Sequence, residues 1–338
     1  MITLEEIRKI QLTGGTTYTV SLPKKWVRQY NLKPGDPVYI RITKDGDILI
    51  SAKKMEREEK IAEIIVNKNI SSERLARDVV AYYLAGYDKI IIKFKCDMQK
   101  HRLFLKKFVK NKMIGLELIE EGRNYVLLQS IIKGSEFPVR KAIERMSIVV
   151  SFMMEDAINA LLSGSKELAQ RIIETDDDVD RLYLYLVRQL NEIVGNPYLI
   201  GEVGLKSNRE CLSYRLISKS IERIGDHTLR IANVVLFNNI SVPEDMKEKL
   251  KSLADELRNY FEKSVEAALN RNSELAHDLL DELPHYKEIQ EELIKQLLKL
   301  GDIKVAMGLR IVIDSLRRIA DYSADIAEIA INLATPEA

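Results

Sequence analysis

The pattern of hydrophobic and polar positions divides the chain into three sections. Residues 1–54 hold short runs that alternate between apolar and polar positions, which is typical of β-strands. Residues 55–135 combine continuous apolar runs with stretches of helical period, which indicates a small α/β unit. Residues 139–336 repeat apolar positions every three to four residues with few interruptions. The pattern therefore predicts a multidomain α+β chain whose C-terminal section is all-α.

The first section reads as strands and turns around one short helix. We expect strands at residues 16–23, 38–43 and 48–52, with a helix at residues 24–31. KPGD at residues 33–36 is a turn because proline fixes φ and glycine permits positive φ, and DGD at residues 45–47 is a hairpin turn. So short a section cannot bury a core by itself, so we expect a partner to cover it.

The middle section shows helical periodicity at residues 71–87 and 97–112, with a buried strand between them at residues 88–95. Two apolar stretches at residues 115–121 and 124–131 flank a glycine, as the strands of a hairpin would. Five cationic-type side chains give the second helix a basic face, which we interpret as solvated: Lys100, His101, Lys106, Lys107 and Lys110. No chemical motif is present, so the role of residues 55–135 stays open.

The third section predicts six helices, at about residues 139–162, 166–195, 208–237, 244–271, 274–300 and 304–334. Breaks rich in Gly, Pro and Asn separate the third helix from its neighbours. SIERIGDHTLRIA (220–232) on the third helix returns as SLRRIADYSADIA (315–327) on the sixth. The repetition predicts a duplicated three-helix unit, with copies at residues 139–240 and 241–336.

Each copy of the repeated phrase carries two carboxylates four residues apart. They are Glu222 and Asp226 in the first copy and Asp321 and Asp325 in the second. Side chains at this spacing stack on one helix face, and like charges there repel by roughly a few tenths of a kcal/mol. A bound cation would offset that repulsion, and oxygen ligands suit Mg, Ca, Mn or oxidised iron. An alternative stays open, in which Lys219, Glu222, Asp226 and Arg230 form a solvated ladder of ion pairs.

Charge is unevenly distributed along the chain. Residues 1–54 contain ten Lys/Arg and five Asp/Glu, whereas residues 139–338 contain 26 Lys/Arg and 34 Asp/Glu. A basic head on an acidic body indicates an anionic partner for the head. Two distant cysteines argue against a disulfide framework. The N-terminus lacks the apolar stretch of a signal peptide, so we expect a cytoplasmic protein without membrane insertion.

The acidic helices resemble those of the PhoU family, which regulates phosphate uptake. ERIGDHTLRIAN, RRIADYSADIAE and TDDDVDRL carry the resemblance, which covers residues 139–336. It implies a pair of three-helix bundles with surface clusters of a divalent or trivalent metal: iron, zinc, magnesium or manganese. The implied ligands are Asp176, Asp180, Glu222, Asp226, Asp321 and Asp325. The second copy departs from the pattern, because Arg317 replaces Glu222 and Leu283 and Lys287 stand where Asp176 and Asp180 would.

The head resembles a different family. TTYTVSLPKKWVRQYNLKPGDPVYIRITKDGDILI is similar to the AbrB/SpoVT swapped-hairpin module of transcription regulators. In that family two chains interleave their hairpins, so the resemblance implies a homodimer that binds double-stranded DNA through basic side chains. The implied DNA-binding residues are Arg8, Lys9, Lys24, Lys25 and Arg28. We interpret Trp26 as a core anchor of the hairpin.

The combination of the two resemblances is similar to archaeal phosphate regulators. It implies a DNA-binding transcriptional regulator of phosphate uptake. The metal-binding body would have a sensory role or a docking role. The alternative is an adaptor that docks on a phosphate transporter ATPase, a kinase or another phosphate-signalling protein, with the hairpin only dimerising. We expect no enzyme, because no Ser, His or Cys arrangement accompanies the carboxylates.

Overall fold

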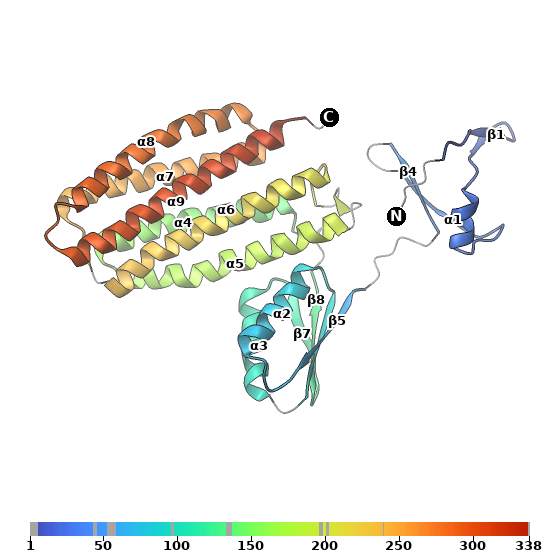
Figure 1. Cartoon of the computed structure of the whole chain (residues 1–338), viewed down its shortest axis with the longest axis horizontal. Helices are drawn as coiled ribbons and strands as arrows, with labels where there is room; N and C mark the ends of the chain where they lie inside the picture. Colours follow the sequence, from blue (N-terminus) through green and yellow to red (C-terminus); the bar gives the residue numbers. More distant parts are fainter. Residues whose placement is uncertain are drawn as a thin grey trace. The chain divides into compact units, whose positions relative to one another are not determined.

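The computed structural model describes residues 6–42, 46–52, 59–95, 98–132, 137–195, 199–200, 203–238 and 240–336. The chain forms two compact units, Met1–Glu58 and Glu59–Ala338. The first unit is the head, and the second combines an α/β domain with a long helical bundle (Figure 1). The multidomain α+β class predicted from the sequence is confirmed. The predicted boundary at residues 134–138 lies mostly outside the described residues.

The described residues of the head form two small antiparallel hairpins and one short helix. Its elements are β1 (Gln11–Thr13), β2 (Thr17–Thr19), α1 (Lys24–Gln29), β3 (Tyr39–Ile42) and β4 (Ile48–Ser51). β1 pairs with β2 around Gly14 and Gly15, which both have positive φ, and β3 pairs with β4. The KPGD turn is confirmed, because the Lys33 amide donates to Asp36 Oδ2 at 2.6 Å. The predicted DGD turn begins at residue 45, which lies outside the described residues.

Two strand predictions for the head need correction. β1 was not predicted from the sequence, and the strand expected at residues 16–23 is limited to β2. Both differences have one physical cause, because Gly14 and Gly15 form a tight turn that lets a three-residue strand fold back on the next. Neither face of this hairpin is buried, so the alternation of residues 16–23 has no core to extend along.

No described residue of the head is buried. Ile7 is 92% exposed and Ile42 is 72% exposed, and many other apolar side chains of the head are also open. A two-stranded hairpin cannot cover its own apolar side chains, which explains why a single head lacks a core.

The α/β domain is one four-stranded sheet with two helices. The strand order is β5 (Ile61–Val66), β6 (Lys89–Phe94), β8 (Tyr125–Ser130) and β7 (Leu116–Glu121). β5 and β6 are parallel, and the other two pairings are antiparallel. The helices α2 (Ser72–Leu84) and α3 (Gln99–Lys112) lie on the same side of the sheet (Figure 1). β5 was not predicted, although alternate residues along it are buried as a one-sided sheet requires.

In its described residues the bundle has six long helices, which enclose one continuous core. They are α4 (Val139–Ser163), α5 (Lys166–Gly195), α6 (Asn208–Asn233), α7 (Glu244–Asn270), α8 (Ser273–Leu297) and α9 (Ile303–Ala334), and a π-helical turn η3 (Val234–Asn238) follows α6. Local signals fix several helix starts, since Asn272 caps α8 and Asp302 caps α9 through side-chain hydrogen bonds to backbone amides. The helix bounds agree with the periodicity of the sequence to within a few residues.

The two three-helix repeats meet along α6 and α9, which pack against each other. His227 on α6 and Tyr322 on α9 occupy corresponding positions of the duplicated phrase, and their ring centroids are 5.9 Å apart. Contact between corresponding residues is what a local two-fold relation between the repeats produces. The α6–α9 seam is therefore one part of the interface between the duplicated halves, and α4 packed against α7 is another.

Among the described residues, α4 is long and apolar enough to cross a membrane by length and composition. Most of its apolar side chains lie in the bundle core, where Ile143, Met146 and Val150 are fully buried. The central position of α4 in the bundle accounts for its composition.

Candidate functional site

Three of the predicted metal ligands come together in the first repeat. Asp176 and Asp180 on α5 lie close enough to Asp226 on α6 for their charges to interact. Burial, together with the smaller effect of the Asp180 and Asp226 carboxylates, raises the pKa of Asp176 to about 7. Gly225 faces this side of α5, since a Cβ added there would lie 3.7 Å from Asp176 Oδ1. The sequence-predicted acidic cluster therefore exists and is partly buried.

A lysine from the α/β domain reaches into this cluster. Lys112 Nζ, at the end of α3, lies 2.5 Å from Asp177 Oδ1 and 2.8 Å from Asp180 Oδ2. Burial alone would lower the pKa of Lys112, but hydrogen bonds to these two carboxylates raise it overall. Its ammonium group therefore supplies positive charge where the sequence suggested a metal. Lys112 was not among the predicted site residues.

Glu222 and Asp226 stack on α6 as expected, and each has a cationic neighbour. Lys219 Nζ donates to both Glu222 carboxylate oxygens at 2.6 Å. Burial raises the pKa of Glu222 despite this contact. Arg223 Nη1 donates to Asp226 Oδ2 at 3.3 Å. The ladder of ion pairs considered from the sequence is thus present at Lys219–Glu222, whereas Asp226 pairs with Arg223.

The second repeat arranges its carboxylates differently. Asp321 Oδ1 lies 3.9 Å from Lys287 Nζ on α8, and Asp321 Oδ2 lies 3.8 Å from Arg318 Nη1. Lys287 occupies the position that corresponds to Asp180, so α8 provides a base where α5 provides an acid. Burial raises the pKa of Asp325, and Glu328 and Asp321 add to the shift. Asp321 is therefore already matched by cationic side chains of its own repeat.

The donor types of the first repeat fit a hard cation, because all are carboxylate oxygens. In the described part of the chain, however, no three His, Cys, Asp or Glu side chains are arranged as a metal-binding group. Lys112 instead balances Asp177 and Asp180. The carboxylates are the type of ligand that a hard cation prefers. In this arrangement, however, Lys112 partly balances their negative charge.

The predicted DNA-binding residues lie on the surface of the head. Lys24, Lys25 and Arg28 are exposed on α1, and none of them forms an ion pair with a described residue. Lys9 is also exposed, and Arg8 pairs with Glu6. The three cations of α1 are therefore available to an anionic partner.

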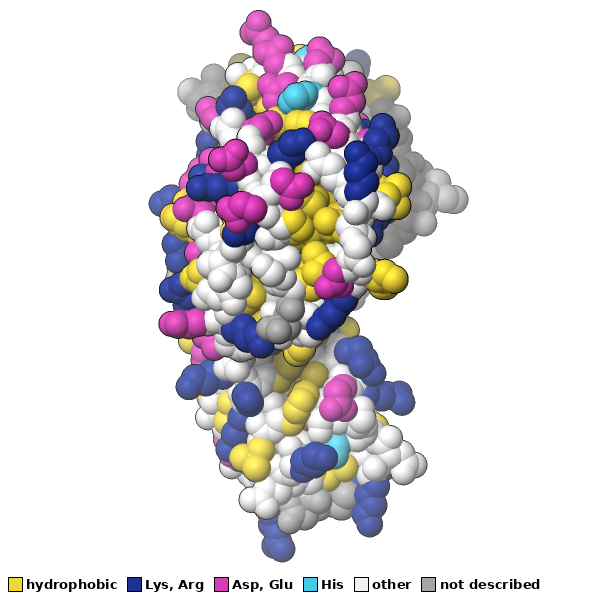
Figure 2. All heavy atoms as spheres, turned by 90° about the vertical axis from the view of Figure 1, so that its left-hand side faces the viewer, with side chains coloured by type: hydrophobic (Ala, Val, Ile, Leu, Met, Phe, Trp, Pro, Cys, Tyr) yellow, Lys and Arg dark blue, Asp and Glu magenta, His cyan; other side chains and the backbone are white. Residues whose placement is uncertain are grey.

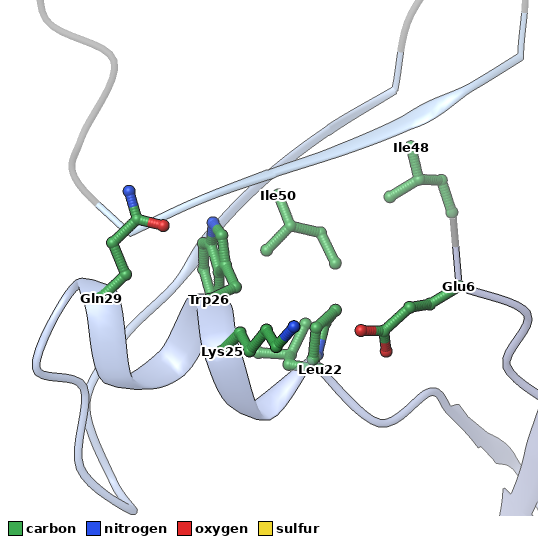
Figure 3. A pocket seen from close by; sticks show the side chains of 8 residues that line it. Glu6, Leu22, Lys25, Trp26, Gln29, Ile48 and Ile50 are labelled. Carbon is green, nitrogen blue, oxygen red and sulfur yellow. The ribbon is translucent and has the colours of Figure 1, made fainter. Parts of the chain in front are cut away.

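A groove of about 420 Å³ opens between α1 and β4 of the head. Leu22 and Trp26 line one side and Ile48 and Ile50 the other, as Figure 3 shows. The Trp26 ring also packs against Tyr30, with ring centroids 5.5 Å apart. Trp26 was interpreted as a core anchor, and in this single chain it is half-buried at the wall of an open groove.

Sequence reasoning missed the buried arginine that joins the α/β domain to the bundle. Arg188 on α5 is 5% exposed, and its Nη1 donates to the carbonyl oxygens of Tyr83 at 2.7 Å and Tyr87 at 2.9 Å. Its Nη2 lies 3.0 Å from Glu192 Oε1. The available signal was an arginine inside the apolar stretch LYLYLVRQL at residues 182–190. Together with Lys112, it ties α2 and α3 to α5.

The surface of the second unit is divided by charge. Figure 2 shows Asp and Glu side chains gathered over the end of the bundle, while Lys and Arg predominate on the α/β domain below it.

The bundle matches the PhoU domain family over residues 143–235 and 250–330, which is just over half of the chain. The chain belongs to the PhoU family. Residues 11–58 match a second family, described as antidote-toxin recognition MazE, bacterial antitoxin. The PhoU body thus carries a MazE/AbrB-like head, and both resemblances noted in the sequence are confirmed.

Named PhoU proteins share the body but little sequence. The phosphate-specific transport system accessory protein PhoU homolog 1 of Thermotoga maritima is 24% identical over 208 residues, which span 58% of this chain and 86% of the relative. A Clostridium acetobutylicum PhoU homolog is 20% identical over 56% of this chain and 88% of its own length. The crystal structure of PhoU from Pseudomonas aeruginosa superposes with a TM-score of 0.52 at 21% identity, covering 58% of this chain and 94% of that one. This likeness supports the PhoU fold of the bundle.

Proposed function

We propose that this chain is a DNA-binding transcriptional regulator of phosphate uptake. The observation that carries the proposal is the fusion of a PhoU body to a MazE/AbrB-like head whose α1 presents Lys24, Lys25 and Arg28 without ion-pair partners among the described residues. Cations placed in this way neutralise DNA phosphates and give salt-dependent binding. The PhoU relatives are named as accessory proteins of phosphate-specific transport, which supports phosphate uptake as the regulated process.

We propose that the head acts as a homodimer in the cytoplasm. The support is its exposed apolar surface and the groove between α1 and β4, which a second head of the same kind would cover. Dimerisation would also double the number of cations that face a two-fold-symmetric DNA site.

We propose that the body binds a divalent or trivalent metal in the first repeat. Asp176, Asp180 and Asp226 would hold it, with Glu222 one turn away on the same helix face as Asp226. When bound, the ion would supply positive charge that Lys112 now supplies in part. Asp321 and Asp325 are the corresponding candidates in the second repeat, where Lys287 and Arg318 already approach Asp321.

The test of DNA binding is capture of genomic fragments by the purified full chain at near-physiological salt. A variant carrying Lys24→Ala, Lys25→Ala and Arg28→Ala is compared with a variant carrying three alanines on the body, at Lys141, Arg145 and Arg171. We expect fragments upstream of phosphate-transport genes to be enriched by the wild type and the body variant, and to be lost by the head variant. Equal capture by both variants would remove the head as the DNA reader.

An adaptor that docks on a phosphate transporter ATPase, a kinase or another phosphate-signalling protein is the second candidate. The observation that favours it is the naming of the relatives as transport accessory proteins. In this case the head only dimerises. Absence of enrichment by the dimeric wild-type protein would support this candidate over DNA binding.

A further inference from the structure

A pocket opens on the seam between the two repeats, apart from the acidic cluster on α5. It has a volume of about 370 Å³. It is lined by His227 and Arg230 from α6 and by Asp314, Arg317 and Arg318 from α9. This volume falls within the range of small-molecule sites in proteins. Three guanidinium groups therefore converge at the place where the duplicated halves meet.

In the described part of the chain, carboxylates balance the arginines of this pocket only in part. Arg230 and Arg317 are exposed and form no ion pair with any described residue. Arg318 has only a long contact to Asp321, 3.8 Å between Nη1 and Oδ2. The single carboxylate in the lining, Asp314, is already engaged by Arg310 at 3.1 and 3.2 Å. The lining residues thus carry an excess of positive charge, which favours an anionic ligand in the pocket.

The duplication shows that the fold itself does not require these arginines. At the corresponding positions of the other repeat, Glu222 stands for Arg317 and Asp325 stands for Arg230, each 95 residues away. The remaining counterparts are Lys219, Arg223 and Tyr322, so the corresponding set has as many acids as bases. The pocket therefore holds three arginines and one aspartate, whereas the corresponding positions of α6 and α9 hold two acidic and two basic side chains.

We infer that the arginine pocket of α6 and α9 binds a compact multivalent oxyanion of the phosphate class. A guanidinium group offers two parallel N–H donors that match two oxygens of a phosphate. Arg230 on one helix and Arg317 and Arg318 on the other reach a ligand from both repeats. The pocket has room for orthophosphate or for a short chain of phosphates. The inference stands apart from DNA binding and from the proposed metal, since it uses neither the head nor the α5 carboxylates.

The test is isothermal titration calorimetry of the full chain in chelator-treated buffer at about 0.15 M chloride. Orthophosphate, pyrophosphate and triphosphate are titrated separately, with ATP as the nucleotide source of the same groups. We expect at least one of them to bind, and Arg317→Glu, which restores the residue of the other repeat, to weaken binding by about tenfold or more. Arg317→Lys keeps the charge without the fork of donors and should bind with intermediate affinity.

Arg145→Glu on α4 is the matched control, because it makes the same charge change at another exposed arginine of the body. It should bind as the wild type does, and circular dichroism establishes that each variant is folded. Equal losses in Arg145→Glu and Arg317→Glu would mean general charge attraction and would overturn the assignment of the pocket. Lack of binding by the wild type to all four ligands at millimolar concentration would overturn the inference itself. Metal binding and DNA capture, measured separately, would be unaffected by either result.

Discussion

At the scale of single residues, Lys112 supplies the acidic cluster with positive charge that was expected from a metal. Helical spacing places Asp176 and Asp180 on one face of their helix, and the resemblance to PhoU implied that they share a site with Asp226. The lysine comes from a different domain, more than sixty positions earlier in the chain, and no local pattern links the two. The basic face predicted for the same helix did not include Lys112. Long-range pairing of this kind depends on how domains pack, which periodicity does not specify.

Replacing Lys112 by methionine tests whether it competes with a metal. The ion pairs are partly exposed, so we expect a loss of only about 0–1 kcal/mol in the free energy of unfolding when metal is chelated. With Mn²⁺ present, the variant should gain more in melting temperature than the wild type, because its carboxylates have lost their internal cation. Thermal melts with and without Mn²⁺ measure both effects.

The control for this variant is Lys106→Met on the same helix. Lys106 pairs with Glu121 at 2.6 Å inside the α/β domain, so its loss removes a similar ion pair without touching the acidic cluster. If both variants respond to Mn²⁺ as the wild type does, Lys112 does not compete with a metal at this site.

At the scale of secondary-structure elements, the sequence predicted the bounds best where an element buries a long apolar face. The six bundle helices follow their predicted bounds because each buries a continuous stripe in one core. β1 and β5 were missed for different reasons. β1 is three residues long and fully exposed, so it has no apolar pattern to detect. β5 buries only Ala62, Ile64 and Val66, and its outward Ile61 and Ile65 hide the alternation.

Arg188 joins α5 to the end of α2, and we expect its loss to lower the free energy of unfolding substantially. Arg188→Ala removes the donor from two backbone carbonyls at the end of α2 and the partner of Glu192, whose side chain is 11% exposed. Breaking a buried pair by removing one partner costs about 3–5 kcal/mol. We expect a loss of that size in the free energy of unfolding of the full chain, measured by urea denaturation.

Arg171→Ala, on an exposed position of the same helix, is the matched control. Its free energy of unfolding should stay within about 0.5 kcal/mol of the wild type. A similarly small change for Arg188→Ala would show that the α/β domain is held on α5 by its apolar contacts, and that the arginine only fills space between them.

At the scale of the whole molecule, the chain combines a body that is complete by itself with a head that is not. The unit Glu59–Ala338, which joins the α/β domain to the PhoU body, encloses an apolar core in each of these two parts. The head has no buried residue among those described. The sequence anticipated this contrast, because 54 residues with short alternating strands cannot bury a core alone, and it also anticipated the duplication of the body. It did not show that the α/β domain packs on α5.

The need of the head for a partner leads to a prediction about the assembly. Ile48 is 65% exposed in the single chain and lines the head groove, so Ile48→Asp should cost one isolated chain little. If a second head covers the groove, each dimer loses two buried isoleucines, worth about 1.5–3 kcal/mol apiece. We expect a dimeric wild type in sedimentation velocity at micromolar concentration, and dissociation of the Ile48→Asp variant with a Kd raised by at least about 100-fold. Leu103→Asp, at a position 61% exposed on α3 of the body, makes the same type of change outside the head and should remain dimeric. A monomeric wild type, or equal dissociation of both variants, would contradict a dimer formed through the head groove.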